Sequence, residues 1–326
     1  MARRFLIAAT AAFLAAAIGL PRDARAEDTK LTVMVFIGVQ NLPLYAAQSQ
    51  GFFAKRGLDV DIKIAPGSEV LRQGLADGKW QIVHTAFDNG VAMADVAKVD
   101  IIGVIGGDNS FNHLLVQPEI GSIKDLRGKT VVVDALNTAY AFQLYDILAK
   151  NGLHKGDYTP KSVGATFKRL AAMQQDKTAA AAILNAPFSI LAVKSGLKDM
   201  GPVSAVIGPY QATAGITTRA WAKANPATMV KYLQAYIEGL RWALDPKHKK
   251  AATDLLAERL KLTPEIAAEC YVLVTDPTNG LVKDAKFDMD GFKNVLKLRA
   301  EFEGGTPAAP EKYLDLSYYK KALAGL

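Results

Sequence analysis

Segments typical of short strands alternate with segments of helical period along most of this sequence. Residues 31–37 are rich in β-formers, and a helix is predicted to follow over residues 42–50. Residues 58–65 form a second predicted strand, and residues 101–105 are apolar throughout, as in a strand buried on both faces. Alternation of this kind favours a mostly parallel sheet with right-handed crossovers. The chain is therefore predicted to be an α/β protein.

The same alternation starts again after residue 118. A polar turn leads into a predicted strand at 130–133, and a helix follows over 139–150, with Asn137 or Thr138 as its cap. Further strands are predicted at 161–165, 179–184, 203–207 and 212–217, and long helices from residue 226 onward form a helical C-terminal tail.

This pattern predicts two lobes, the second inserted into the first. Lobe 1 would comprise residues 27–118 and 210–326, and lobe 2 residues 119–209. The chain would cross between them near residues 113–118 and 210–216, and two short crossovers would make a hinge. A cleft between two such lobes is where ligands bind.

The first 26 residues have the pattern of a secretory signal peptide. Arg3 and Arg4 precede an apolar run over residues 5–20, and Ala24-Arg25-Ala26 places small residues at the −3 and −1 positions of a cleavage site. The apolar run is shorter than the ~20 residues that span a membrane. We therefore expect a cleaved leader and a periplasmic protein that begins at Glu27.

Composition argues against several functions. The net charge is +7, of which the leader supplies +3, and the remaining Lys and Arg are interleaved with acids, so nucleic-acid binding is not expected. The four histidines are far apart without metal-ligand spacing, and the one cysteine, Cys270, cannot form an intramolecular disulfide. We predict no metal site, no cofactor and no catalytic residue.

Several segments resemble one family in the family's own order. Residues 43–60, PLYAAQSQGFFAKRGLDV, closely resemble the opening helix of solute-binding proteins of the nitrate/sulfonate/taurine and thiamine-precursor type. Residues 125–131 look like the entry into that family's second lobe. Further similar segments lie at 185–188, 220–226 and 313–318.

This resemblance implies a fold and a function. The fold would be the two-lobed periplasmic binding protein fold of type II. The function would be capture of a small organic solute (sulfonate, carboxylate, aromatic or heterocyclic) between the lobes and its delivery to an inner-membrane ABC permease. Lobe closure around the solute and a monomeric state are expected. A ligand-loaded sensor subunit would need the same cleft, and the sequence does not separate these two roles.

Candidate solute contacts lie in loops that follow strands, where parallel α/β lobes bind ligands and helix N-termini gather. The candidates are Asn41, Thr85, Phe87, Asp88, Asn137, Thr138, Tyr140, Asn185, Phe188 and Gln211. Helix capping would equally explain four of them (Asn41, Asp88, Thr138 and Asn185). The three aromatic residues could instead pack in the core, and Gln211 could lie on the surface. His84, at the end of a strand, is interpreted as a core histidine.

Two features bear on the charge of the solute. A free Asp88 carboxylate in the cleft would favour an amine or heterocycle N–H over a nitrate or sulfonate, whereas a capping Asp88 would not. No arginine occupies the candidate loops, so no bidentate anion clamp is predicted.

An enzyme of the same fold is the alternative function. Thiamine-pyrimidine synthases resemble this family but depend on a cysteine-rich motif that is absent here, and sulfinate-cleaving relatives use a cysteine nucleophile in the cleft. Cys270 lies among apolar residues of a late predicted helix, a setting typical of inert buried thiols. We therefore predict that the protein is not an enzyme.

Overall fold

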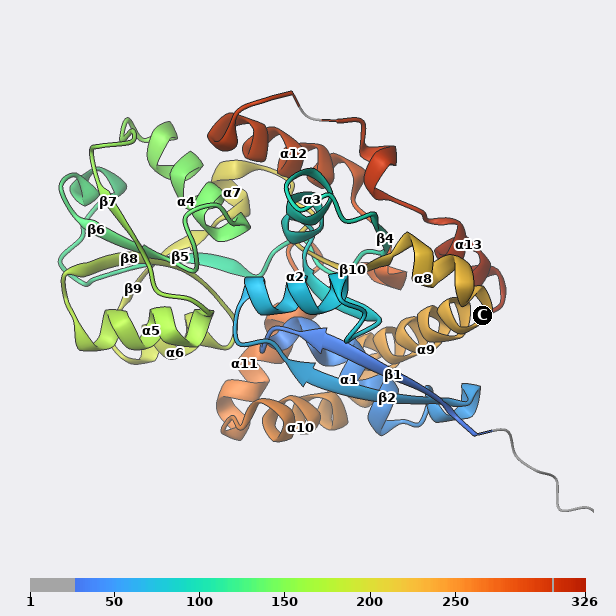
Figure 1. Ribbon diagram of the computed structural model, residues 1–326. Coiled ribbons are helices and arrows are strands. Elements are labelled where there is room, and N and C mark those ends of the chain that lie inside the picture. Colours follow the sequence, from blue (N-terminus) through green and yellow to red (C-terminus); the bar gives the residue numbers. More distant parts are fainter. Residues whose placement is uncertain (1–26, 307) are drawn as a thin grey trace, which may run out of the picture.

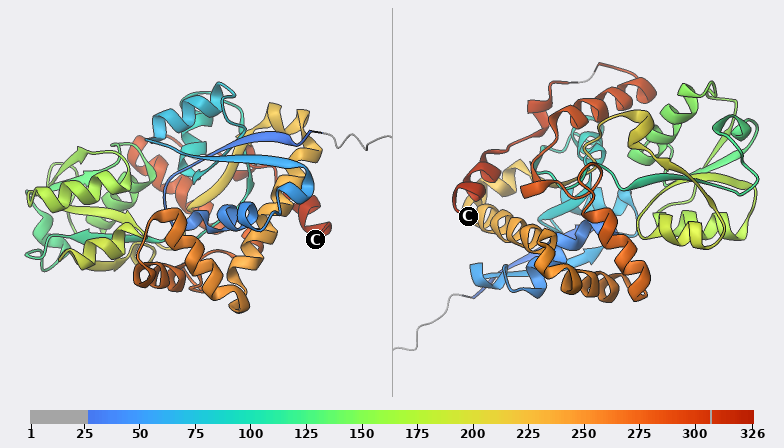
Figure 2. Two further views of the ribbon diagram at one scale, coloured as in Figure 1. Left: turned by 90° about the horizontal axis from the view of Figure 1, so that it is seen from below. Right: turned by 180° about the vertical axis from the view of Figure 1, so that it is seen from behind.

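The computed structural model describes residues 27–306 and 308–326. The predicted signal peptide lies outside the described residues. Two sheets, each of five strands, form the centres of two lobes that lie side by side, with the second lobe in green in Figure 1. Figure 2 shows the same two lobes from below and from behind.

The first sheet has the strand order β2-β1-β3-β10-β4. Its strands are β1 (Thr29–Val35), β2 (Leu58–Ile64), β3 (Ile82–Ala86), β4 (Ile101–Ile105) and β10 (Thr213–Thr218). β1 pairs in parallel with β2 and β3, and β10 is antiparallel to both β3 and β4. Four strands thus point in one direction, as the alternating pattern predicts, and the strand that returns from the second lobe points in the other.

The second sheet repeats this arrangement with the order β7-β6-β8-β5-β9. Its strands are β5 (Asn112–Val116), β6 (Thr130–Val133), β7 (Thr159–Ser162), β8 (Ala179–Asn185) and β9 (Lys198–Pro202). β6 is parallel to β7 and β8, and β5 is antiparallel to β8 and β9. Here too one strand runs against four.

Helices cover the sheets and build the C-terminal region. They are α1 (Leu42–Ser49), α2 (Ser68–Ala76), α3 (Asp88–Asp95), α4 (Ala139–Lys150), α5 (Thr166–Gln175), α6 (Phe188–Lys194), α7 (Ser204–Ile207), α8 (Arg219–Ala224), α9 (Pro226–Leu244), α10 (Lys249–Leu260), α11 (Pro264–Val274), α12 (Met289–Glu303) and α13 (Ser317–Ala324). None of the helices in residues 27–306 and 308–326 is long and apolar enough to cross a bilayer.

The two crossings between the sheets differ from the expected ones. They occur between β4 and β5, at residues 106–111, and between α7 and β10, at residues 208–212. Residues 113–116, expected in a hinge, belong to β5, because the apolar run that ends at Val116 is buried between β8 and β9. Residues 204–207, expected as a strand, form α7, and the strand before them is the more polar β9. The outer boundaries of the lobes stay predictions.

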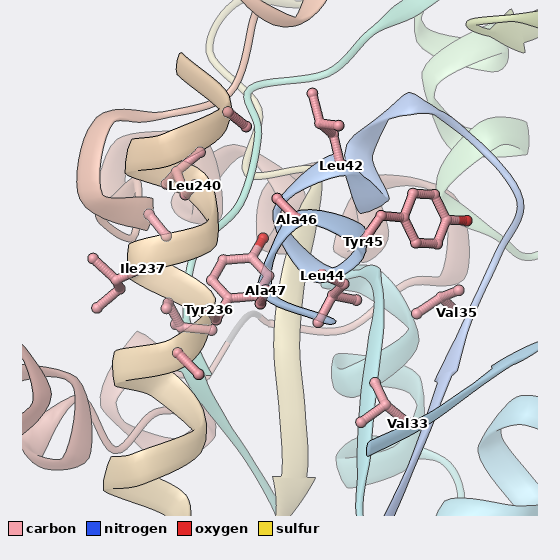
Figure 3. Close-up of a cluster of buried hydrophobic side chains, with 14 of the residues drawn as sticks. Val33, Val35, Leu42, Leu44, Tyr45, Ala46, Ala47, Tyr236, Ile237 and Leu240 are labelled. Atoms are coloured by element: carbon pink, nitrogen blue, oxygen red, sulfur yellow. The ribbon is translucent and has the colours of Figure 1, made fainter. Parts of the chain in front are cut away.

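The core of the first lobe depends on close packing of α9 against α1. Figure 3 shows Tyr236, Ile237 and Leu240 of α9 beside the buried Ala46 and Ala47 of α1. Gly239 faces the same helix: a Cβ there would lie 2.3 Å from the carbonyl oxygen of Pro43 and 2.8 Å from the amide nitrogen of Ala47. The absence of a side chain at Gly239 therefore sets the distance between the two helices.

α12 connects the two lobes at the top of Figure 1. Its Arg299 forms a buried ion pair with Asp88 of the first lobe, with 2.7 Å between Nη1 and Oδ1. Three residues further on, Phe302 stacks on Phe142 of α4 in the second lobe, with ring centroids 5.9 Å apart. A single helix thus contacts both lobes through side chains one turn apart.

Candidate functional site

A cavity of about 610 Å³ lies between the two lobes. Its walls come from the loop after β1, the start of α2, the end of β3, the first turn of α3, both crossings and the loops that begin α4 and α5. This is the edge where the carboxyl ends of the parallel strands meet, so the chain topology predicts a ligand site there. The volume is within the usual range for small-molecule sites.

The N-termini of three helices contribute to the wall. Gly67 to Val70 at the start of α2, Thr138 to Tyr140 at the start of α4, and Ala165 with Thr166 at the start of α5 all line the cavity. Thr138 caps α4, since its Oγ1 accepts a hydrogen bond from the Ala141 amide at 3.5 Å. The N-caps of α2 and α5 make no side-chain cap hydrogen bond. Unpaired N–H groups and the helix dipoles place partial positive charge at these positions.

Many polar atoms around the cavity have no partner in the protein. In the described part of the chain, eight buried side-chain nitrogen or oxygen atoms lack a hydrogen bond, and five belong to residues that line this cavity. The five are His84 Nδ1, Asn89 Oδ1, Asp108 Oδ2, Arg169 Nε and Asn185 Oδ1. Buried polar atoms are nearly always paired in folded proteins. Most of the unpaired buried polar side-chain atoms of the described residues therefore belong to the wall of this one cavity.

Arg169 is a buried cation in the cavity wall. Its side chain is on α5, and the residue is 1% exposed. Its guanidinium donates to the carbonyl oxygens of Gly164 and Ile183, at 2.7 and 3.2 Å, and to Thr166 Oγ1 at 3.1 Å. It also lies over the ring of Tyr140, 4.4 Å from the centroid. All these partners are uncharged, and within the described residues no carboxylate lies within 4.0 Å of it.

Asp108 is a buried anion on the first crossing. The residue is 2% exposed, and its Oδ1 accepts a hydrogen bond from the Ser110 amide at 2.9 Å. Burial raises the pKa of the Asp108 carboxyl to about 6, although Thr213 and the Ser110 N–H oppose the rise. The wall also carries Glu69, Arg72 and Asp134. The cavity therefore has charges of both signs, in contrast to a purely cationic anion site.

His84 also lines the cavity, although it was interpreted as a core histidine. Its Nε2 is 2.9 Å from the Tyr232 hydroxyl, and its ring stacks on Tyr236 with centroids 4.9 Å apart. Burial lowers the pKa of His84 to about 3, so the ring is neutral at physiological pH. It is a packed histidine with one ring nitrogen, Nδ1, left without a partner.

Half of the predicted contact residues line the cavity. They are Thr85, Asn137, Thr138, Tyr140 and Asn185. Thr85 accepts a hydrogen bond from Asn89, and Asn185 donates one to Gln40 of the other lobe at 3.4 Å. The structure brings together the strand-end loops of both lobes, as the two-lobe prediction requires.

The other five predicted residues lie outside the lining. Asn41 donates to the Phe36 carbonyl instead of capping α1, and Phe188 packs in the second lobe. Phe87 packs edge-on against Phe287 and Phe292, so the core interpretation of this residue is the correct one. The remaining two, Asp88 and Gln211, are both buried.

Asp88 neither faces the cavity nor caps α3. Burial raises the pKa of its carboxyl while Arg299 opposes the rise through a 2.7 Å ion pair. Gln211 is also fully occupied: its side chain donates to the Thr213 carbonyl and accepts from the Asp288 amide. Neither of the two roles considered for Asp88, charge selection in the cleft or capping of α3, is supported by its position.

Sequence reasoning missed the two buried ions of the wall. Arg169 follows Lys168 in α5, and nothing in the local sequence distinguishes the buried one from its neighbour. Asp108 follows Gly106-Gly107, a glycine pair at the end of a buried strand, and this was the one available signal. Gln143 and Tyr210 also line the cavity. They were missed because the sequence does not show which side of α4, or which part of the second crossing, faces the cavity.

Comparison with known proteins identifies the family. The NMT1/THI5-like family model matches residues 39–249, well over half of the sequence. The chain belongs to the NMT1/THI5-like family. A search of curated proteins by sequence finds no match.

Solved structures show the fold. A protein from Bordetella bronchiseptica RB50 is 22% identical with a TM-score of 0.76, covering 92% of this chain and 98% of that one. The periplasmic nitrate-binding protein NrtA from Synechocystis PCC 6803 is 16% identical with a TM-score of 0.76, covering 92% and 89%. The periplasmic aliphatic sulphonate binding protein SsuA from Escherichia coli is 16% identical with a TM-score of 0.71, covering 89% and 99%. The periplasmic binding protein fold predicted from the resemblance is confirmed.

Cys270 lies away from the cavity. It is fully buried in α11 and is not among the lining residues. Burial raises its pKa to about 12, so the thiol is protonated at physiological pH. In the described segments, no group of three or more His, Cys, Asp or Glu residues is arranged to hold a metal ion.

Proposed function

We propose that this protein is the solute-binding component of an ABC-type import system and that it holds a small organic anion between its lobes. The observation that carries the proposal is Arg169, a buried guanidinium in the cavity wall with only uncharged partners. Burying a charge without a counter-charge is costly, and a bound anion would offset the cost. Nitrate and sulphonate, which the names of NrtA and SsuA give as their ligands, are both anions.

The helix N-termini support the same assignment. α4 and α5 both begin at the cavity wall, next to Tyr140 and Arg169. Carboxylate, sulfonate or phosphate oxygens would accept from their free N–H groups in the favourable field of the helix dipoles. The anionic group of the solute is therefore expected on the second lobe, close to Asn137 and Thr138.

Contacts between the lobes provide a means of closure. Asn185 of the second lobe donates to Gln40 of the first at 3.4 Å, and the Val39 amide donates to the Ala186 carbonyl at 3.3 Å. A solute that touched both walls would favour the conformation in which these contacts form. Export to the periplasm through the predicted signal peptide, delivery to a permease, a monomeric state and the lack of enzymatic activity are part of the same proposal.

Thermal unfolding against a panel of solutes tests the proposal. The protein would be refolded from denaturant to remove any bound solute, then heated with nitrate, alkanesulfonates, aromatic and aliphatic carboxylates, pyrimidines and cationic amines. A ligand at ~1,000 times its Kd adds about 4 kcal/mol to stability, which raises the midpoint by several degrees. We expect stabilisation by organic anions. A response confined to cationic amines or uncharged pyrimidines would contradict it.

A further inference from the structure

The carboxylate of Asp108 has no counter-charge in the cavity wall. Its Oδ1 accepts a hydrogen bond from the Ser110 amide, Thr213 lies close enough to lower its pKa, and Oδ2 has no hydrogen-bond partner among the described residues. Within the described residues, no Lys, Arg or His nitrogen lies within 4.0 Å of it. The comparison with Asp88 is informative, since that equally buried carboxylate is paired with Arg299.

The backbone around Asp108 holds this carboxylate in place. The Ala212 amide of the second crossing donates to the Asp108 carbonyl at 3.2 Å, and the Val282 amide donates to the Gly107 carbonyl at 2.9 Å. Ser110, which donates to the side chain, has a φ of 94°, a conformation that non-glycine residues rarely adopt. Such strain persists only where the surroundings enforce it. The carboxylate is therefore preorganised, and its position is not the result of a mobile loop.

We infer that Asp108 forms a second subsite in the cavity, which selects solutes that carry an ammonium group or another N–H donor as well as the anionic group. This inference rests on the proposed function, in which the second lobe binds the anion. A donor from the solute would pair with Oδ2, and the buried negative charge would gain a positive partner. The solute would thus be amphoteric, with opposite charges at its two ends.

Asp134 and His84, which also line the cavity, do not replace Asp108 in this role. Asp134 Oδ1 already accepts from the Thr138 hydroxyl at 2.5 Å, and His84 is neutral. The ionisable side chains of the wall, apart from Asp108, are Glu69, Arg72, His84, Asp134, Tyr140, Arg169 and Tyr210. Tyr236 of α9 is also close enough for the Asp108 charge to raise its pKa.

Matched pairs of probes test the inference. Glycine, β-alanine and γ-aminobutyrate would be titrated calorimetrically against acetate, propionate and butyrate, which lack only the amine. We expect at least one amino acid to bind about tenfold or more tightly than its partner, as for a charge-assisted hydrogen bond. The advantage should decrease as the pH falls below about 6, where Asp108 takes up a proton.

Asp108→Asn should remove this preference while binding of the simple acids persists. Asp59→Asn, which removes an exposed charge of β2, should leave the preference unchanged. If the simple acids bind and the amine adds nothing, or if Asp108→Asn keeps the preference, the inference is wrong and the proposed function stands. If neither series binds to refolded protein and no anion of the larger panel does, both are wrong.

Discussion

Replacing Asp108 with Asn should raise the free energy of unfolding at neutral pH but leave it nearly unchanged at acidic pH. In the folded state, burial raises the pKa of this carboxyl from 3.8 to about 6. Between these two pKa values, the native state therefore holds a proton that the unfolded chain releases. The stabilisation that comes from the protonated carboxyl is complete below pH 3.8 and is lost as the pH rises to about 6. Each pH unit corresponds to about 1.4 kcal/mol, so about 3 kcal/mol is lost at neutral pH.

Asn cannot ionise and keeps the acceptor for the Ser110 amide, so Asp108→Asn should avoid that loss. Thermal unfolding of both proteins without solute should show a midpoint roughly 5 °C or more higher for the variant at pH 7.5. At pH 4 the two midpoints should nearly coincide. Asp59→Asn controls for the change in net charge and should show no such dependence. An equal effect at both pH values, or none at pH 7.5, would refute the reasoning.

Four further perturbations address the fold and the site. Gly239→Ala should cost about 1–3 kcal/mol or more in denaturant unfolding, because its Cβ would meet the backbone of α1; unchanged stability would contradict that packing. Arg299→Met should cost about 3–5 kcal/mol by leaving Asp88 unpaired, whereas Arg219→Met, at an exposed pair, should cost under about 1 kcal/mol. Cys270→Ser should leave solute binding intact, and the native thiol should resist alkylation until the protein unfolds; rapid labelling would contradict its burial. Asn137→Ala with Thr138→Ala should weaken anion binding while costing about 1 kcal/mol for the lost cap of α4; unchanged affinity would remove this turn from the site.

Local chemistry explains which parts of the structure were predictable. Thr138, one of the two predicted caps, is the cap of α4; a cap is predictable because it needs only the residues of one turn. The spacing of apolar residues likewise predicted that strands and helices alternate in both lobes. β5 was missed because its apolar run was interpreted as a crossover, and its partner β8 is about 70 residues away in the chain.

Charge pairing required the folded structure. From the sequence, Asp88 was a candidate for selecting the charge of the solute. In the structure it is paired with Arg299, which lies 211 residues further along the chain. Arg169, conversely, looks unremarkable in the sequence, and only a preceding glycine pair marks Asp108. Their burial without a counter-charge is visible only in the folded structure. The sequence thus predicted the strand-end loops that meet at the cavity between the two sheets, but not which charges line it.

Calorimetric titration of Arg169→Met tests the central claim most directly. The probe would be whichever of nitrate, propanesulfonate or butyrate stabilises the refolded parent most, and Arg127→Met, at an exposed ion pair of the same lobe, would be the control. Circular dichroism would establish that both variants are folded. If the buried guanidinium binds the anion of the solute, Arg169→Met loses about tenfold or more in affinity and the control loses none. Equal affinity of a folded Arg169→Met and the parent would contradict the proposed site.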